Sequence, residues 1–123
     1  MLKQEELIKK IKNYNPFLNK LALSKAYSFA LNAHENQTRD SGDPYLIHPV
    51  AVADILCDLK LDSATITTGL LHDTIEDTKT TYSTVKKEFG KEIADLVEGV
   101  TKISQLEGKA YSNSKAENFR KLI

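Results

Sequence analysis

The chain has 123 residues, of which 41% are hydrophobic and 28% are charged, and its 17 lysines and arginines balance its 17 aspartates and glutamates. This length and composition are typical of one globular domain with its own core, and the absence of a basic excess argues against a partner that is a nucleic acid polymer. A single cysteine, Cys57, excludes an internal disulfide and a cysteine-rich zinc site, and no apolar run has the length of a signal peptide core or a membrane span, so we expect a cytoplasmic protein without membrane contact.

The first half of the chain predicts two helices separated by a loop. Asn15-Pro16 is typical of a helix start, and residues 37–45, rich in Ser, Gly, Asp and Pro, predict the loop. His48-Pro49 again places a proline just inside a helix start. Helical spacing predicts the buried faces, which for the first helix are Leu18, Ala22, Ala26, Phe29, Ala30 and Ala33, and for the second Val52, Ile55, Leu56 and Leu59.

The second half predicts further helices. Asp62 is a suitable cap for a helix that runs to about Asp73, although the β-branched residues 65–68 would also suit a strand. We favour the helix because no partner strand is evident elsewhere. Thr80 or Thr81 begins a short helix that ends near residues 89–90, and a loop is expected at residues 104–112, before a capping box at residues 114–117. The apolar face of the helix between them is expected to be Ile93, Leu96, Val97 and Val100.

Histidine and acidic residues form the pattern with the most chemical content. His72-Asp73 is followed by Glu76-Asp77, and residues four apart share one face of a helix. Imidazole and carboxylate together bind Mn²⁺, Fe²⁺ or Zn²⁺, and further carboxylates can activate a water. The alternative is a core histidine followed by a charged helix end. The spacing alone leaves both interpretations open.

Longer motifs decide between these interpretations. The four segments are HENQTRDSGDPYLIHP at residues 34–49, LLHDTIEDT at 70–78, FGKEIADLVEGVTK at 89–102 and AENFRKLI at 116–123. They closely resemble the hydrolase domain of the RelA/SpoT family of guanosine tetraphosphate enzymes, from about residue 21 onward. The resemblance implies a single all-α domain over residues 1–123, folded as an HD-domain helical bundle. It also implies Mn²⁺-dependent removal of the 3′-pyrophosphate from ppGpp and pppGpp, which gives GDP or GTP plus pyrophosphate.

The resemblance assigns roles to individual residues. His48, His72 and Asp73 match the metal ligands, while Glu76 and Asp77 match the residues that position and activate the attacking water.

A loop of the same family lies along the nucleotide base. Arg39, Asp40 and Ser41 match it, and Arg39 is the residue expected to stack on guanine, since its guanidinium is planar and cationic. Tyr45 is expected to pack under this loop rather than touch the ligand, and His34 is expected in the core or behind the ligands.

Three departures from the family pattern stand out. Asp40 replaces a basic or hydroxyl residue and Asn36 replaces a glycine, although asparagine tolerates a left-handed helix end. No residue after Asp77 matches the fourth metal ligand of the family, an aspartate on a later helix, and its synthetase domain is also unmatched. We therefore expect an incomplete domain with weakened metal binding, whose uncovered apolar surface favours self-association.

Three hypotheses follow from these patterns. The first is a metal-dependent (p)ppGpp 3′-pyrophosphohydrolase. The second is a catalytically impaired HD-domain remnant that binds a nucleotide or a protein. The third is an HD hydrolase that acts on another nucleotide.

Overall fold

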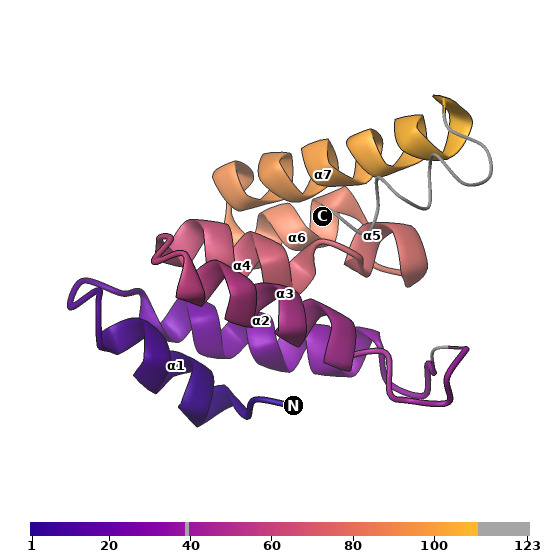
Figure 1. The fold of residues 1–123 in the computed structure, drawn as a ribbon. Coiled ribbons are helices and arrows are strands. Elements are labelled where there is room, and N and C mark those ends of the chain that lie inside the picture. Colours follow the sequence, from indigo (N-terminus) through magenta and orange to yellow (C-terminus); the bar gives the residue numbers. More distant parts are fainter. Residues whose placement is uncertain (39, 111–123) are drawn as a thin grey trace.

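The computed structural model describes residues 1–38 and 40–110, with the backbone alone for residues 104–110. Within this part of the chain the only β-type pairing is an isolated antiparallel bridge between Thr38 and Pro44, so the expected all-helical fold is confirmed (Figure 1). The elements in order are α1 (Gln4–Lys12), α2 (Lys20–Ala33), α3 (Ile47–Asp58), α4 (Ser63–Leu71), α5 (Thr74–Asp77), α6 (Tyr82–Phe89) and α7 (Lys91–Ala110).

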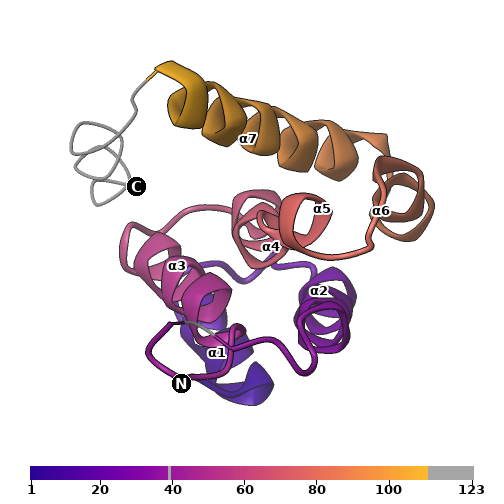
Figure 2. The same cartoon turned by 90° about the vertical axis from the view of Figure 1, so that its right-hand side faces the viewer.

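Helix α4 is the centre of the fold. It packs against α2, α3 and α7, and in both views it lies between the layer formed by α1 to α3 and the long helix α7 (Figures 1 and 2). All residues from 66 to 71 are buried. A helix that is buried on every side needs compact or apolar residues all round. Burial against three neighbours therefore explains why β-branched residues at 65–68 form a helix here.

Helix ends follow the capping chemistry of the sequence at two of the expected positions. Asp62 caps α4 by accepting a hydrogen bond from the Thr65 N–H at 2.9 Å. The hydroxyl of Thr81 accepts from the Thr84 N–H at 3.2 Å and begins α6, which ends before Gly90. The loop at residues 37–45 and the helix that carries His48 are also confirmed.

The predicted start of α2 was wrong. Asn15 closes a short turn by accepting from the Phe17 N–H at 3.0 Å, and Phe17 remains 92% exposed. Asn19 is the actual cap, since its side chain accepts from the Ala22 N–H at 3.0 Å. Two asparagines with the same capping chemistry lie four residues apart, and tertiary packing selects the second.

Two buried faces also differ from the prediction. Ile55 on α3 and Leu59, which caps its C-terminus, are exposed, whereas the buried residues of α3 are Pro49, Val50, Ala53 and Cys57. This helix is apolar on most sides, so periodicity could not select the face that meets α4. On α7, Leu96 and Val100 are exposed. Among the residues of α7 up to position 103, the buried ones are Ala94, Val97 and Thr101.

Helix α7 also extends further than expected. It continues through residues 104–110, where a loop was predicted. Glutamine, leucine, glutamate, lysine and alanine in this segment are good helix formers and outweigh its single glycine. The predicted capping box at residues 114–117 lies outside the described residues. None of the described helices is both long and apolar enough to cross a bilayer.

Helix α1 was not predicted and packs beneath α2 and α3. Leu7 and Ile11 bury one face of it, while Lys10 forms ion pairs with both Asp54 and Asp58 on α3. Across the same contact, the Tyr14 hydroxyl donates to the Leu61 carbonyl at 2.7 Å. Burial is the main reason that the pKa of Tyr14 rises to about 12. The C-terminal half of α3 is thus fixed to α1 and to the turn that follows α1.

Candidate metal centre

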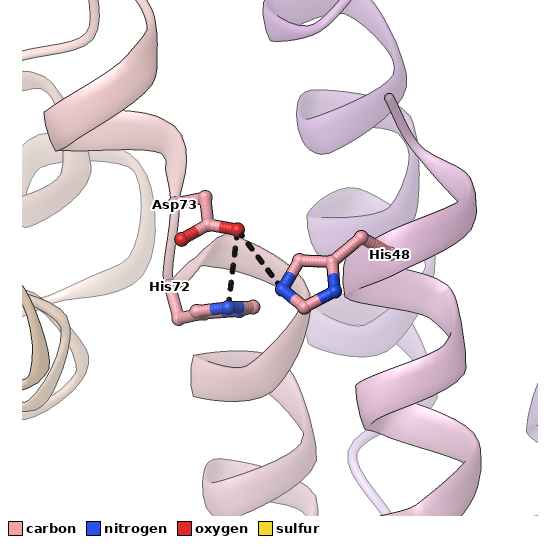
Figure 3. A group of neighbouring side chains, drawn as sticks. All are labelled: His48, His72 and Asp73. Carbon is pink, nitrogen blue, oxygen red and sulfur yellow. Dashed lines mark ion pairs between the residues drawn. The ribbon is translucent and has the colours of Figure 1, made fainter. Parts of the chain in front are cut away.

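Three potential metal ligands converge at the junction of α3 with the end of α4. His48 lies in the first turn of α3, and His72 and Asp73 lie between α4 and α5. One carboxylate oxygen of Asp73, Oδ2, lies 3.1 Å from His72 Nε2 and 3.3 Å from His48 Nε2 (Figure 3). The two imidazole rings meet edge to face, with centroids 5.2 Å apart. The resemblance grouped these three residues, and the fold brings them together.

These distances fit a shared metal ion. Donor atoms bound to one ion at roughly 2.0–2.2 Å lie about 3–3.5 Å from each other, and the three donors of this cluster lie within 4.8 Å of one another. Two imidazoles and one carboxylate suit divalent ions such as Mn²⁺, Fe²⁺ and Zn²⁺. The side chains of His72 and Asp73 are 17% and 16% exposed and that of His48 is 36% exposed, so the cluster is sheltered but remains partly accessible to solvent.

A break in the helix lets adjacent residues reach the same point. Neighbouring residues on a continuous helix diverge by about 100° around its axis, but α4 ends at Leu71 and α5 begins at Thr74. The buried hydroxyl of Thr74 donates to the Leu71 carbonyl at 2.7 Å and so satisfies an acceptor at the end of α4. His72 and Asp73 occupy the two positions of this break.

The orientation of His72 is fixed by the backbone of α4. Its Nδ1 lies 2.6 Å from the carbonyl oxygen of Gly69. A carbonyl only accepts, so Nδ1 carries the proton and Nε2 is left for the cluster. This arrangement, with an imidazole nitrogen held by a carbonyl behind it, is typical of histidines that bind metals.

The cluster also shifts the pKa values of its members. Burial lowers the pKa of His72, but the hydrogen bond and charge of Asp73 outweigh it, so the net pKa is raised. Burial raises the pKa of Asp73, but the bond to His72 and the charges of His72 and His48 outweigh it, so its pKa is lowered. The lowered pKa of Asp73 favours the ionised carboxylate, which is the form that binds a metal, whereas the raised pKa of His72 means that its imidazolium must lose a proton before Nε2 can bind an ion.

Asp77 lies next to the cluster, and Tyr45 joins it to Asp73. The Tyr45 hydroxyl is 2.5 Å from Asp77 Oδ2 and 3.4 Å from Asp73 Oδ2. Burial, together with these carboxylates, raises the pKa of Tyr45 well above its ordinary value. The sequence prediction that Tyr45 packs under the loop missed this contact. Its position three residues before His48 was the only available signal.

The other predicted site residues that the structure describes lie on α5 and in the loop at residues 37–45. Glu76 is exposed on α5, and the backbone N–H of Asp77 donates to the Asp73 carbonyl at 2.9 Å. The two acids therefore follow the ligand pair on a separate short helix rather than on a continuation of α4. Asp40 and Ser41 are exposed in the loop, where the Ser41 hydroxyl lies 3.0 Å from an Asp43 carboxylate oxygen.

Arg39 lies outside the described residues, so its predicted stacking role is not tested. Asn36 adopts a φ of 68° just after α2, in the left-handed conformation that asparagine tolerates. Replacement of the family glycine is therefore accommodated. His34 is buried behind the site, with its ring stacked on that of Tyr45 at a centroid distance of 4.5 Å.

Comparisons with known proteins identify the family of the chain. A family model described as an HD domain matches residues 26–123. The chain is 48% identical over 123 residues to a GTP pyrophosphokinase rsh of Brucella melitensis, which covers all of this chain and 16% of that protein. It is 50% identical over 119 residues to the bifunctional (p)ppGpp synthase/hydrolase SpoT of Escherichia coli K12, which covers 97% of this chain and 17% of that protein.

A third relative has the same level of similarity. The chain is 50% identical over 119 residues to a guanosine-3′,5′-bis(diphosphate) 3′-pyrophosphohydrolase of Shigella flexneri, of which it covers 17%. The chain therefore spans a small part of the length of these relatives. The resemblance to the RelA/SpoT family and the expected HD-domain bundle are both confirmed.

Proposed function

Since the chain belongs to the HD domain family, we propose that it is a metal-dependent hydrolase of ppGpp and pppGpp that releases the 3′-pyrophosphate. The observation that carries this proposal is the convergence of His48, His72 and Asp73 on one point, with Asp77 joined to it through Tyr45. Relatives named as (p)ppGpp hydrolases support the substrate.

In this proposal His48, His72 and Asp73 hold Mn²⁺. The ion would act as a Lewis acid on the 3′-diphosphate and would lower the pKa of a bound water. The protein contributes the orientation of its ligands, because the Gly69 carbonyl fixes the ring of His72 and the helix break places Asp73 beside it.

Glu76 and Asp77 are proposed to position the attacking water and to receive its proton. The oxygen of the water forms a new bond to the 3′-phosphorus, and the bond from that phosphorus to the ribose 3′-oxygen breaks. The 3′-oxygen leaves with a proton as the nucleotide hydroxyl. Water is thus consumed, and GDP or GTP and pyrophosphate are released. An exposed carboxylate on a short helix beside the ligands is well placed for this proton transfer.

The loop at residues 37–45 is proposed to bind the guanine nucleotide through Arg39, Asp40 and Ser41. Gly42 adopts a φ of 89° at its tip, a backbone conformation that L-residues with side chains rarely adopt. Asp40 is exposed, so its carboxylate can turn into solvent and away from the phosphates.

A non-catalytic binding role is less well supported than hydrolysis. A remnant without selection for chemistry has no need to keep three metal donors converged and two acids adjacent to them. The hydrogen bonds of Thr74 and His72 to backbone carbonyls hold this arrangement in place. Hydrolysis is therefore the function that the geometry supports best.

The experiment is release of pyrophosphate from ppGpp, with and without Mn²⁺, by the chain and by two variants. His72→Ala removes a ligand, and Glu76→Gln removes a proposed proton acceptor at nearly constant size. Glu92→Gln is the matched control, since Glu92 is an exposed acid in the first turn of α7. We expect Mn²⁺-dependent turnover that is lost in both site variants and kept in the control.

Two outcomes would contradict the proposal. Turnover that persists in His72→Ala would show that the reaction does not depend on the metal centre. Mn²⁺ binding by the wild-type chain without turnover of ppGpp would favour the remnant. A second nucleotide with a pyrophosphate group, ATP, is tested at equal metal concentration, because preference for it would indicate an HD hydrolase of different specificity.

A further inference from the structure

Tyr45 contacts two carboxylates that have different proposed tasks. Its hydroxyl lies 2.5 Å from Oδ2 of Asp77 and 3.4 Å from Oδ2 of Asp73. A phenol carries one proton and donates one strong hydrogen bond. The distances assign that bond to Asp77, while 3.4 Å is too long for a strong bond to Asp73. Tyr45 is thus bonded strongly to the proposed proton acceptor and only weakly to the proposed metal ligand.

The phenol ring is itself held in place from α2. It stacks on the ring of His34 at a centroid distance of 4.5 Å and an interplanar angle of 21°. His34 is only 3% exposed, so this side of the ring is a buried platform. The Tyr45 N–H donates to the Gln37 carbonyl at 3.0 Å, which closes the base of the loop. Side chain and backbone contacts therefore both fix where the hydroxyl lies.

Gln37 holds the other end of Asp77. Its Nε2 donates to the Asp77 backbone carbonyl at 2.7 Å, and its Oε1 lies 2.9 Å from His34 Nδ1. The backbone carbonyl only accepts, which fixes the orientation of the amide and makes His34 Nδ1 the donor. The backbone of Asp77 is thus held by Gln37 and its carboxylate by Tyr45, and both contacts depend on His34.

We infer that Tyr45 is a positioning residue, which binds Asp77 Oδ2 so that the other carboxylate oxygen is left to receive a proton from the attacking water. The inference rests on the proposed function and deepens it. Without the phenol, the carboxylate can rotate about its side-chain bonds and leave the position in which it meets the water, because Asp77 is otherwise exposed. The loop before α3 would then control the chemistry through Asp77 without contact with the reacting atoms.

The test compares two Tyr→Phe variants. Tyr45→Phe removes the hydroxyl and keeps the ring on His34. Tyr82→Phe is the matched control, because the Tyr82 hydroxyl also donates to an aspartate, Asp95, at 2.5 Å. That contact joins α6 to α7, and neither helix carries a proposed site residue. For Tyr45→Phe we expect kcat on ppGpp to fall by roughly 10- to 100-fold, the range typical of lost support behind a catalytic group.

The same experiment separates positioning from a merely structural role. Because Asp73 keeps its contacts with both histidines, Mn²⁺ affinity and KM should change by less than about threefold, and so should the corresponding values of the control. A loss of Mn²⁺ affinity equal to the loss of kcat, or an unchanged kcat, would overturn the inference. Gln37→Met, which removes the donor to the Asp77 carbonyl, provides a second variant and should lower kcat in the same way.

Failure of the inference differs from failure of the proposed function. Turnover in the wild type that Tyr45→Phe leaves intact rejects the positioning role alone. No turnover in the wild type rejects the proposed function, and with it any role of Tyr45 in that reaction. A double-mutant cycle of Tyr45→Phe with Asp77→Ala on the unfolding equilibrium then reports the contact itself, and additive effects would show that the two side chains are not coupled.

Discussion

Gly69 lies where α4 passes closest to α3, and its replacement by alanine tests how tightly this contact is packed. A Cβ at this position would lie 2.7 Å from Leu56 Cδ1 and 3.6 Å from Val52 Cγ1. Carbon atoms in favourable contact are about 3.5–4.0 Å apart, so Leu56 or the helix must move by roughly 1 Å. Alanine would otherwise stabilise a helix interior by about 1 kcal/mol relative to glycine.

The two effects have opposite signs, and overpacking is the larger when Leu56, which is half-buried and packs against the core, keeps its rotamer. Forcing an extra carbon into a packed contact costs about 1–3 kcal/mol, so we expect Gly69→Ala to lower the free energy of unfolding by about 1 kcal/mol. In a Leu56→Ala background the obstructing atom is absent. There the same substitution should raise the free energy of unfolding by roughly 0.5–1 kcal/mol.

The assay is urea denaturation of the wild type, both single variants and the double variant, followed by far-ultraviolet circular dichroism. The signature is a change of sign between the two backgrounds, which corresponds to a coupling of about 1–3 kcal/mol. Because α3 carries His48 and the carbonyl of Gly69 orients His72, Mn²⁺ binding should weaken in Gly69→Ala and recover in the double variant. An equal stabilisation by alanine in both backgrounds would refute the reasoning.

Two further predictions concern the ends of α4. Asp62→Ala should lower the free energy of unfolding by about 1 kcal/mol at neutral pH, and Asp62→Asn by much less. Hydrogen bonds from Thr65 lower the pKa of Asp62 from 3.8. The charge-dependent part of its stabilisation is thus present above pH 3.8 and is lost as the pH falls through the folded-state pKa, which denaturation at neutral pH and at a pH below that pKa checks. Thr74→Val leaves the Leu71 carbonyl without its buried donor and should cost about 1–3 kcal/mol in urea denaturation, whereas Thr74→Ser should restore most of the loss.

Local chemistry was sufficient to predict several parts of the fold. The caps at Asp62 and Thr81, the loop at residues 37–45 and the helix beginning near His48 depend on residues within one or two turns. The three converging ligands were grouped by the resemblance rather than by spacing. In these regions the sequence contains the information because the determining contacts are local.

Other features depend on contacts between distant segments. The buried face of α3 is set by packing on α4 and by the pairs of Lys10 with Asp54 and Asp58, and an apolar helix gives no periodic signal for it. The contact of Tyr45 with Asp77 joins residues 32 positions apart. The buried Thr74 hydroxyl bonds the Leu71 carbonyl across the helix break at residues 72–73. A threonine can make such a bond in many sequence contexts, so its presence does not predict the break.

Binding of a divalent ion should in turn stabilise the contact between α3 and α4. His48 belongs to one helix and the pair His72-Asp73 follows the other, so an ion held by all three residues joins the two elements. A ligand that binds only the folded state stabilises it by about 2.7 kcal/mol at a hundredfold excess over its Kd. Mn²⁺ should therefore raise the unfolding midpoint of the wild type, a chelator should reverse the change, and Asp73→Asn should reduce it. A midpoint that Mn²⁺ leaves unchanged, in a chain shown to bind the ion, would mean that the unfolded chain binds it equally well, and the argument that the fold itself assembles the centre would fail.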